Sequence, residues 1–398
     1  MKVALLLDPG IEVIDSNSCG GTERAFLLFL DFLYKERIDR KSFSAAKVKS
    51  GKKYIINKLF YPTWLKEIGE KLIDRSHHDP LLWKIGSYIK VLAELPYCLV
   101  FIMKSIDCDV LVSFNIPLVS ILSPRRTILR IGYPAGYVFF PLQRMLKSRY
   151  QQTYFYFVSK NLCTKFIKNH PHLSPNRHEV IHNGIDTALF QPKKEMNRVR
   201  HKQHLTFLYA SNWNKRKGIF MLLKAARVLE EKGLKFKLLL AGGPDLWSNI
   251  DVRRKAKKIS ERVYREAKRL KNTEIVGKKN YRSLPKLYHA ANFVVFPSIW
   301  REPFGFTIIE AMSCGTPVIA FKRGASPEII KNNKTGYLIS DVNTKGLIRA
   351  IQNLIQNETL SHIRQMGQAA REEASHKYSL QTWERSVKKL LEKRLKDQ

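Results

Sequence analysis

The amino-acid sequence predicts an α/β fold with two doubly wound domains. Two observations support this class. Short apolar runs alternate with amphipathic helical patterns, and the alternation starts afresh in the second half of the chain after a polar segment at residues 193–204. Apolar runs of this kind are typical of buried parallel strands, and helices are the usual connections between such strands. We therefore expect one domain over residues 1–192 and another over 193–379, joined by the polar segment.

The first half contains four runs with the length and composition of buried strands, at residues 3–7, 109–113, 127–131 and 154–159. A loop ending in Gly20 and Gly21 follows the first run and leads into an apolar helix over 25–34. Two glycines at a strand-to-helix turn let an anion or a sugar approach the backbone, although a simple tight turn is the commoner reason for such a pair. Residues 35–104 lose the clear alternation.

The second half continues the pattern with further apolar runs. Its predicted strands are residues 205–210, 236–240, 274–276, 293–296 and 318–321. Between the second and third of these, residues 251–271 form a strongly basic helical pattern with a thin apolar stripe. After the fourth, a loop leads into an apolar helix over 307–313, which Gly315 and Pro317 end.

Two acidic residues stand out near this last helix. Glu302 precedes it and Glu310 lies within it, about one turn from its start, so both carboxylates can face one ligand. The backbone N–H groups of Gly305, Phe306 and Thr307 lie at the helix N-terminus, where a diphosphate is favoured. Carboxylates accept hydrogen bonds from vicinal hydroxyls, so the set suits a sugar nucleotide. The alternative is that Glu310 is a solvated helix residue and Glu302 a charge favoured by the helix dipole.

The segment E-P-F-G-F-T-I-I-E-A-M-S-C-G-T-P-V, which starts at Glu302, resembles the E-x7-E signature of retaining GT-B glycosyltransferases of group 1 (family 4). This resemblance implies that Glu310 binds the nucleotide ribose and that Glu302 lies near the donor sugar. The loop with Gly20 and Gly21 resembles the G-G-x-E-R loop that lines the acceptor side of the cleft in that family. The resemblance also implies two Rossmann-like domains facing across a cleft, with a C-terminal helix over 380–398 joined to the first domain.

Two further matches concern the donor. In the family, an Arg and the Lys of a K-G pair hold the donor diphosphate; Lys217 matches the Lys, whereas Asn212 stands at the Arg position, with Arg216 as a possible substitute. Three adjacent cations before a helix also describe a solvated turn. Gly277 and Lys278 match the strand and glycine turn that cradle the nucleobase.

The resemblance implies transfer of a hexose from a nucleotide diphosphate sugar, either UDP- or GDP-linked, to a hydroxyl with retained anomeric configuration. The leaving phosphate is expected to act as the base, with no metal and no other cofactor. One departure concerns a histidine that faces the donor phosphate in many members, where this chain has Arg130, Ile131 and Gly132. The missing Arg and His keep an alternative open: a basic nucleic-acid-binding protein, or an inactive relic that binds nucleotides.

Charge is the most informative feature of the composition. The chain has 70 Lys and Arg against 34 Asp and Glu, a formal net charge of +36. Residues 1–192 hold 27 of these cations and 16 of the acids, and residues 193–398 hold 43 and 18. Such an excess implies polyanionic surroundings, for which nucleic acid, anionic lipid and a generally basic proteome are all explanations.

Residues 41–97 interleave lysines with aromatic residues, which suits either a membrane interface or an ordinary amphipathic helical pair. No uninterrupted apolar run is long enough for a membrane span, because Glu94 and Pro96 break the best candidate, and a signal peptide is not expected. The five scattered cysteines fit a reducing cytosol.

We therefore expect a cytoplasmic enzyme, peripheral at the inner face of an anionic membrane. Its expected acceptor is a glycan or lipid-linked precursor in lipopolysaccharide or other envelope polysaccharide assembly. Attachment is expected to use surface cations such as Lys47, Lys49, Lys52 and Lys53. A soluble enzyme acting on a small acceptor is the competing hypothesis.

Overall fold

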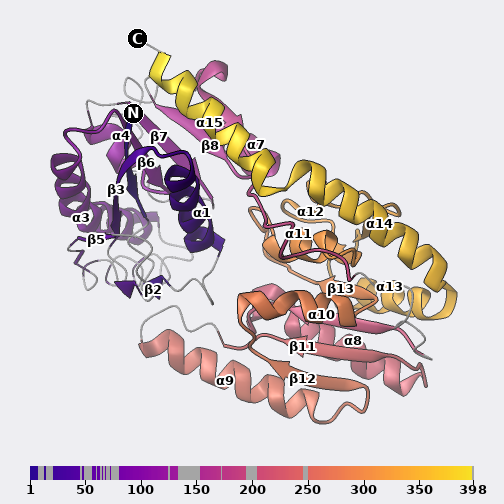
Figure 1. The fold of residues 1–398 in the computed structure, drawn as a ribbon. Coiled ribbons are helices and arrows are strands. Elements are labelled where there is room, and N and C mark those ends of the chain that lie inside the picture. The colour runs from indigo at the N-terminus through magenta and orange to yellow at the C-terminus, as the bar shows by residue number, and fades with distance from the viewer. Residues whose placement is uncertain are drawn as a thin grey trace. The chain divides into compact units, whose positions relative to one another are not determined.

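The structure is a computed structural model with two compact units (Figure 1). One unit comprises Met1–Ile181 and Glu384–Gln398, and the other His182–Trp383. The structure describes residues 1–7, 13–14, 21–44, 47–48, 56–59, 61–62, 65, 68, 72, 80–123, 126–132, 153–171, 173–193, 204–244 and 250–396. Each unit has its own parallel sheet, so the predicted α/β class with two doubly wound domains is confirmed.

The units divide the chain at other residues than the predicted limits after 192 and 379. Residues after Ile181 belong to the second unit because Ile185 pairs with Ser379 and the buried Phe190 ring packs on Tyr281. Most of the predicted linker over 193–204 lies outside the described residues.

The sheet of the first unit has the strand order β5-β3-β1-β6-β7-β8-β9 among the described residues, and all its pairings are parallel. Its strands are β1 (Lys2–Leu6), β3 (Asp39–Ser44), β5 (Asn57–Lys58), β6 (Val110–Phe114), β7 (Thr127–Ile131), β8 (Tyr154–Phe157) and β9 (His178–Val180). The four strands predicted in this half are present as β1, β6, β7 and β8. A small separate sheet pairs β2 (Val13–Ile14) with β4 (Lys47–Val48).

Aromatic contacts pack helices on this sheet: Phe26 packs edge-on against Phe114 of β6, and Phe166 packs against Phe157 of β8. The described helices are α1 (Gly21–Lys35), α3 (Pro80–Lys104), α4 (Leu118–Leu122) and α7 (Lys160–Asn169), with a short 3-10 turn at Pro175–Arg177. From Glu384 onward, α15 (Leu380–Lys396) also belongs to this unit. It is held to α1 by the ion pair between Lys35 and Glu384 and by that between Lys388 and Glu36.

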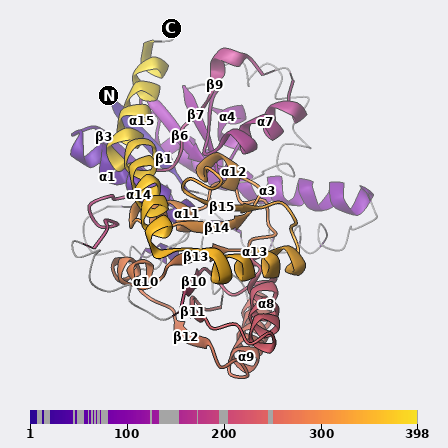
Figure 2. The ribbon, with the colours of Figure 1, turned by 90° about the vertical axis from the view of Figure 1, so that its right-hand side faces the viewer.

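Helix α3 differs from the expectation. No apolar run long enough for a membrane span is expected because of Glu94 and Pro96, yet both lie within one helix of 25 residues, which Figure 2 shows as a single long ribbon. Glu94 is buried against the unit, and Pro96 deprives only the carbonyl of Leu92 of its helical donor at a position exposed to water. In the described part of the chain, residues 84–104 are by length and composition apolar enough to cross a membrane, with 44% of the most apolar window buried inside the protein.

The sheet of the second unit has the order β12-β11-β10-β13-β14-β15, again with parallel pairings. Its strands are β10 (Thr206–Ala210), β11 (Lys237–Ala241), β12 (Thr273–Gly277), β13 (Phe293–Phe296), β14 (Val318–Phe321) and β15 (Gly336–Ile339). The winding direction reverses between β10 and β13. In doubly wound sheets, ligands bind outside the carboxyl ends of the strands at such a reversal.

Helices cover both faces of this sheet (Figure 1). They are α8 (Ile219–Glu231), α9 (Ile250–Ala267), α10 (Leu284–Ala290), α11 (Phe306–Ser313), α12 (Ser326–Ile329), α13 (Thr344–Asn357) and α14 (Leu360–Lys377), with 3-10 turns at Lys215–Lys217 and Tyr281–Ser283. In α8, Leu222, Ala226 and Leu229 recur at helical spacing and are buried in one core cluster with Phe293. The core therefore fixes the strand ends from which the site loops emerge.

Candidate functional site

The loops that follow β10 and β13 meet where the strand order reverses. The backbone carbonyl of Arg216 accepts hydrogen bonds from the N–H groups of Ile299 (2.9 Å) and Trp300 (3.2 Å). Gly218 makes this approach possible, because a Cβ atom at this position would lie 1.9 Å from the carbonyl oxygen of Pro297. Its φ of 78° also lies in the left-handed region that favours glycine. The K-G pair therefore brings the first loop against the second.

An ion pair joins these two loops. Lys217 Nζ lies 2.6 Å from Glu302 Oε1, and Ser298 Oγ donates a hydrogen bond of 2.9 Å to the same oxygen. Glu302 is 7% exposed, whereas the Lys217 side chain keeps 26% exposure. Glu302 is thus buried rather than solvated, and Lys217 is less exposed than Lys215 and Arg216, which share its turn.

The loop after β14 holds the backbone of Glu302. The carbonyl of Glu302 accepts a hydrogen bond of 2.9 Å from the N–H of Ala325. Gly324 packs so closely that an added Cβ would lie 2.5 Å from both the nitrogen and the oxygen of Glu302. The Glu302 carboxylate is therefore positioned by loops from three neighbouring strands, β10, β13 and β14.

Glu310 is also buried rather than solvated. It lies in α11, is 3% exposed, and its Oε2 accepts a hydrogen bond of 2.6 Å from the hydroxyl of Tyr288 in α10. Burial, and next the negative charge of Glu310, raise the pKa of the Cys314 thiol one turn further along the helix. A buried carboxylate with a fixed orientation can accept hydrogen bonds from ligand hydroxyls without first losing side-chain freedom.

The start of α11 lies at the end of β10. Gly305 precedes the helix, Phe306 and Thr307 are its first two residues, and Thr307 Oγ1 donates a hydrogen bond of 3.2 Å to the carbonyl of Ala210, the last residue of β10. The predicted helix N-terminus is thus present. Its first N–H groups carry the positive end of the helix dipole and suit an anion.

The remaining predicted residues have other surroundings. The Arg216 side chain is exposed, and its guanidinium carbon lies 5.1 Å from the centre of the Trp300 ring, in the loop after β13. Gly277 ends β12, which is separated from β10 by β11, and the exposed Lys278 follows it. In the first unit, Gly21 is the first residue of α1. Gly20 lies outside the described residues.

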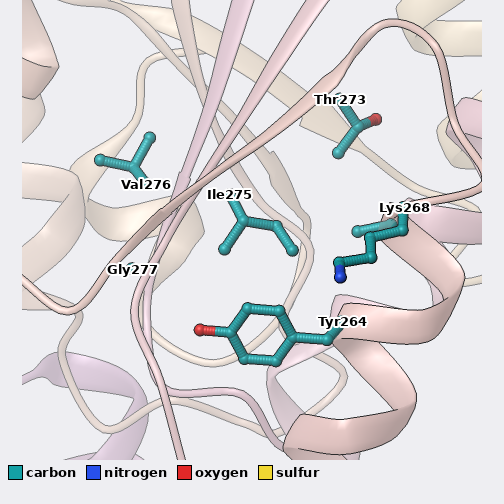
Figure 3. A pocket seen from close by; sticks show the side chains of 7 residues that line it. Tyr264, Lys268, Thr273, Ile275, Val276 and Gly277 are labelled. Carbon is teal, nitrogen blue, oxygen red and sulfur yellow. The ribbon is translucent and has the colours of Figure 1, made fainter.

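A cavity of about 400 Å³ lies beside β12 (Figure 3). Tyr264 of α9 and Lys268, which follows that helix, form one side, and Ile275 and Gly277 of β12 form the other. Its full lining is Tyr264, Ala267, Lys268, Thr273, Ile275, Val276 and Gly277. The cavity combines an aromatic ring, aliphatic groups and one amino group, so a flat ring fits its chemistry. Its lining includes Gly277 but none of the residues around Glu302 and Glu310.

The departure at Arg130 is structural in character. Arg130 is the second-to-last residue of β7 and is 1% exposed. Its guanidinium carbon lies 5.2 Å from the centre of the Phe114 ring and 5.8 Å from the centre of the Tyr156 ring. Cation–π contacts of this kind stabilise a buried arginine. The side chain that stands near the position of the family histidine is thus surrounded by the aromatic core of its own unit.

Sequence reasoning missed the residues that orient the two carboxylates. Ser298 lies two residues after β13 and four before Glu302, but a serine in a loop carries no specific signal. Tyr288 lies in another helix and has no sequence pattern that connects it to Glu310. Among the described residues, no group of three or more His, Cys, Asp and Glu side chains is placed to hold a metal ion.

Comparison with known proteins gives consistent similarities. The family described as glycosyl transferases group 1 matches residues 175–373, half of the chain. An uncharacterized glycosyltransferase of Methanocaldococcus jannaschii is 28% identical over 62% of this chain and 62% of its own length. A capsular polysaccharide biosynthesis glycosyltransferase, CapM of Staphylococcus aureus, is 26% identical over 64% of this chain and 66% of its own. The matches thus span just under two thirds of these relatives.

Solved structures resemble the whole chain in fold. HepE of Anabaena, solved in complex with UDP-glucose, superposes with a TM-score of 0.68 over 99% of this chain and 100% of its own, at 18% identity. At that identity the likeness shows a shared fold.

Proposed function

This chain belongs to the group 1 glycosyltransferases, and from that premise we propose that it transfers a hexose from a nucleotide diphosphate sugar to an acceptor hydroxyl with retention of anomeric configuration. The observation that carries the proposal is the cluster of Lys217, Glu302 and Ser298 at the strand-order reversal, one loop away from the helix that holds Glu310. Two buried carboxylates suit the hydroxyls of a sugar nucleotide, and a partly exposed cation and a helix N-terminus suit its diphosphate.

In this proposal the donor diphosphate binds at the start of α11, against the N–H groups of Phe306 and Thr307. Glu310 accepts hydrogen bonds from the ribose hydroxyls, and Glu302 accepts them from the sugar being transferred. Gly277 and Lys278 contact the nucleobase. The cavity beside β12 includes Gly277, and its Tyr264 ring supports the placement of a planar base near this strand.

Lys217 has two roles in succession. Its amino group pairs with the Glu302 carboxylate. A bound diphosphate offers a second anion, and the partly exposed amino group turns toward it. As the bond between the anomeric carbon and the phosphate oxygen breaks, Lys217 and the α11 amides stabilise the charge on the departing diphosphate. The acceptor oxygen forms the new bond on the same face of the sugar, and its proton passes to the departing phosphate oxygen.

The chemistry proposed here uses neither a metal ion nor another cofactor, so turnover should be unchanged by EDTA. Acceptor residues belong to the other unit, where the loop with Gly20 and Gly21 remains the candidate. We propose a glycan or lipid-linked acceptor in envelope polysaccharide or lipopolysaccharide assembly, at the cytoplasmic membrane face. Support comes from the net charge of +36 and from the likeness to CapM, whose name refers to capsular polysaccharide biosynthesis.

Two substitutions test the assignment. Glu310→Ala should mainly weaken binding of UDP or GDP, whereas Lys217→Ala should mainly lower kcat, because its interaction grows as the diphosphate leaves. Lys215→Ala is the matched control, since Lys215 lies in the same 3-10 turn but is exposed. Unchanged nucleotide binding and turnover in both test variants would contradict the assignment.

A thermal-unfolding panel identifies the nucleotide before any acceptor is known. UDP or GDP should raise the unfolding midpoint of the wild-type protein, because a ligand that binds only the folded state stabilises it. Glu310→Ala should lose most of that increase. Protection by an oligonucleotide, with none by either nucleotide, would instead favour a nucleic-acid-binding protein.

A further inference from the structure

Helix α3 carries a row of exposed apolar side chains. Leu81, Ile85, Tyr88 and Leu92 follow one another at spacings of four, three and four residues, and Leu99 and Met103 continue on the same helix face after gaps of seven and four residues. Their exposed fractions range from 41% at Ile85 to 71% at Met103. Isolated exposed apolar residues are common, but a row along one helix face is typical of an interaction surface.

The opposite face of α3 is buried against the rest of its unit. Ala93, Tyr97 and Phe101 have no exposed surface. The Tyr97 hydroxyl donates a hydrogen bond of 2.8 Å to the carbonyl of Leu7, and the Phe101 ring packs edge-on against Phe43. A helix that crossed a membrane would have to abandon these contacts. The helix is therefore suited to lie along a surface with only its outer row in contact.

Charge identifies the surface. Within α3 the only acidic residue is Glu94, which is 8% exposed, so the outer face presents no carboxylate from this helix. Exposed cations stand near both ends of the row, Lys84 and Lys104. The nearby Asp107 is neutralised by Lys2 and Lys41, whose hydrogen bonds hold its pKa well below the usual range.

These observations favour an anionic bilayer over a second copy of the chain. Each copy has a net charge of +36, so association of two copies is opposed by repulsion, whereas anionic lipid is attracted. Lysine stems can lie along apolar surface while the amino groups reach lipid phosphates, and a tyrosine suits the depth of the headgroups.

We propose that the outer row of α3 inserts into the interfacial region of an anionic membrane and is the lipid-docking surface of this protein. The docking places α3 in the plane of the membrane. The inference names the element behind the membrane association proposed above, but does not depend on the transfer reaction. It locates the attachment on α3; of the lysines expected from the sequence, Lys49, Lys52 and Lys53 lie outside the described residues.

The test is flotation of the full chain with vesicles of phosphatidylcholine containing phosphatidylglycerol, compared with vesicles of phosphatidylcholine alone. The wild-type protein should float with the anionic vesicles. The double variant Leu92→Glu with Met103→Glu should bind them at least about tenfold more weakly, because two apolar contacts are lost and two charges must be kept in water. The matched control is Gln356→Glu with Gln365→Glu, which adds the same charge at two exposed positions of the second unit and should bind like the wild type.

Three outcomes would overturn the inference. One is a wild-type protein that ignores anionic vesicles at low salt, and another is equal loss of binding in the test and control variants, which would indicate charge alone. The third is a wild-type dimer in sedimentation without lipid that the α3 variant converts to monomer, since the row would then be an interface between copies. The thermal midpoint and its increase with UDP or GDP should be the same in both double variants, which separates lost docking from misfolding and from failure of the proposed nucleotide site.

Discussion

Removing one partner of the ion pair between Lys217 and Glu302 should destabilise the second unit, and removing both should restore most of the loss. Lys217→Met leaves the Glu302 carboxylate, 7% exposed, with the Ser298 hydroxyl at 2.9 Å as its remaining side-chain donor among the described residues. Breaking a fully buried pair in this way costs about 3–5 kcal/mol. Because the Lys217 side chain keeps 26% exposure, water screens the pair, and we expect about 2–3 kcal/mol here.

The assay is a double-mutant cycle on urea and thermal unfolding. Lys217→Met and Glu302→Gln are measured alone and together, with Lys215→Met as the control for loss of a lysine from the same turn. For a unit of this size, each kcal/mol lowers the midpoint by roughly 2–4 °C. The double variant should recover most of the stability, with a coupling energy of about 2 kcal/mol. Additive losses would refute the ion pair as drawn.

The same cycle separates stability from chemistry. In the proposed mechanism Lys217 stabilises the departing diphosphate and Glu302 orients the sugar, so the double variant should be stable and yet inactive. Recovery of turnover together with stability would show that the pair only holds the two loops together. The conclusion about catalysis would then be wrong even though the structural one stood.

Three further predictions use other contacts. Tyr288→Phe should weaken UDP or GDP binding by roughly tenfold in titration calorimetry, because Glu310 loses the hydroxyl that donates to it at 2.6 Å. A hydrogen bond to a charged group contributes about 1.5–3 kcal/mol. Unchanged affinity would place Glu310 outside the nucleotide site. Gly218→Ala should unfold at clearly lower temperature, because its Cβ would collide with the carbonyl of Pro297; an unaltered midpoint would contradict the loop contact. With an alkylating reagent at pH 8, Cys314 should react far more slowly than the half-buried Cys163. Burial raises the pKa of the Cys314 thiol, so little of it is present as the reactive thiolate. Equal alkylation rates of the two cysteines, measured by mass spectrometry, would refute this.

The fold was predictable because its signals are local. A strand such as β13, with Phe-Val-Val-Phe before Pro297, is identified by four consecutive residues, and the order of the elements then follows from their alternation. The region 35–104 was not predictable in the same way. Its strands β3 and β5 are polar and lie toward the edge of the sheet, and α3 is apolar on both of its faces, so that neither shows a simple period.

The site divides along the same line. Glu302, Glu310 and the start of α11 lie in one segment, so local spacing was enough to group them in one predicted site. The partners that orient them are distant in sequence: Lys217 is 85 residues from Glu302, and Tyr288 is 22 residues from Glu310. These contacts depend on the reversal of strand order between β10 and β13. The reversal places side by side two loops that are neighbours in the sheet but far apart in the chain. The contact requires glycine at position 218 because a side chain there would collide with the carbonyl of Pro297. This proximity arises only on folding and cannot be read from the sequence. A motif residue such as Glu302 thus predicts which loop forms the site. Which cation pairs with that residue depends on which loops lie next to each other in the folded sheet.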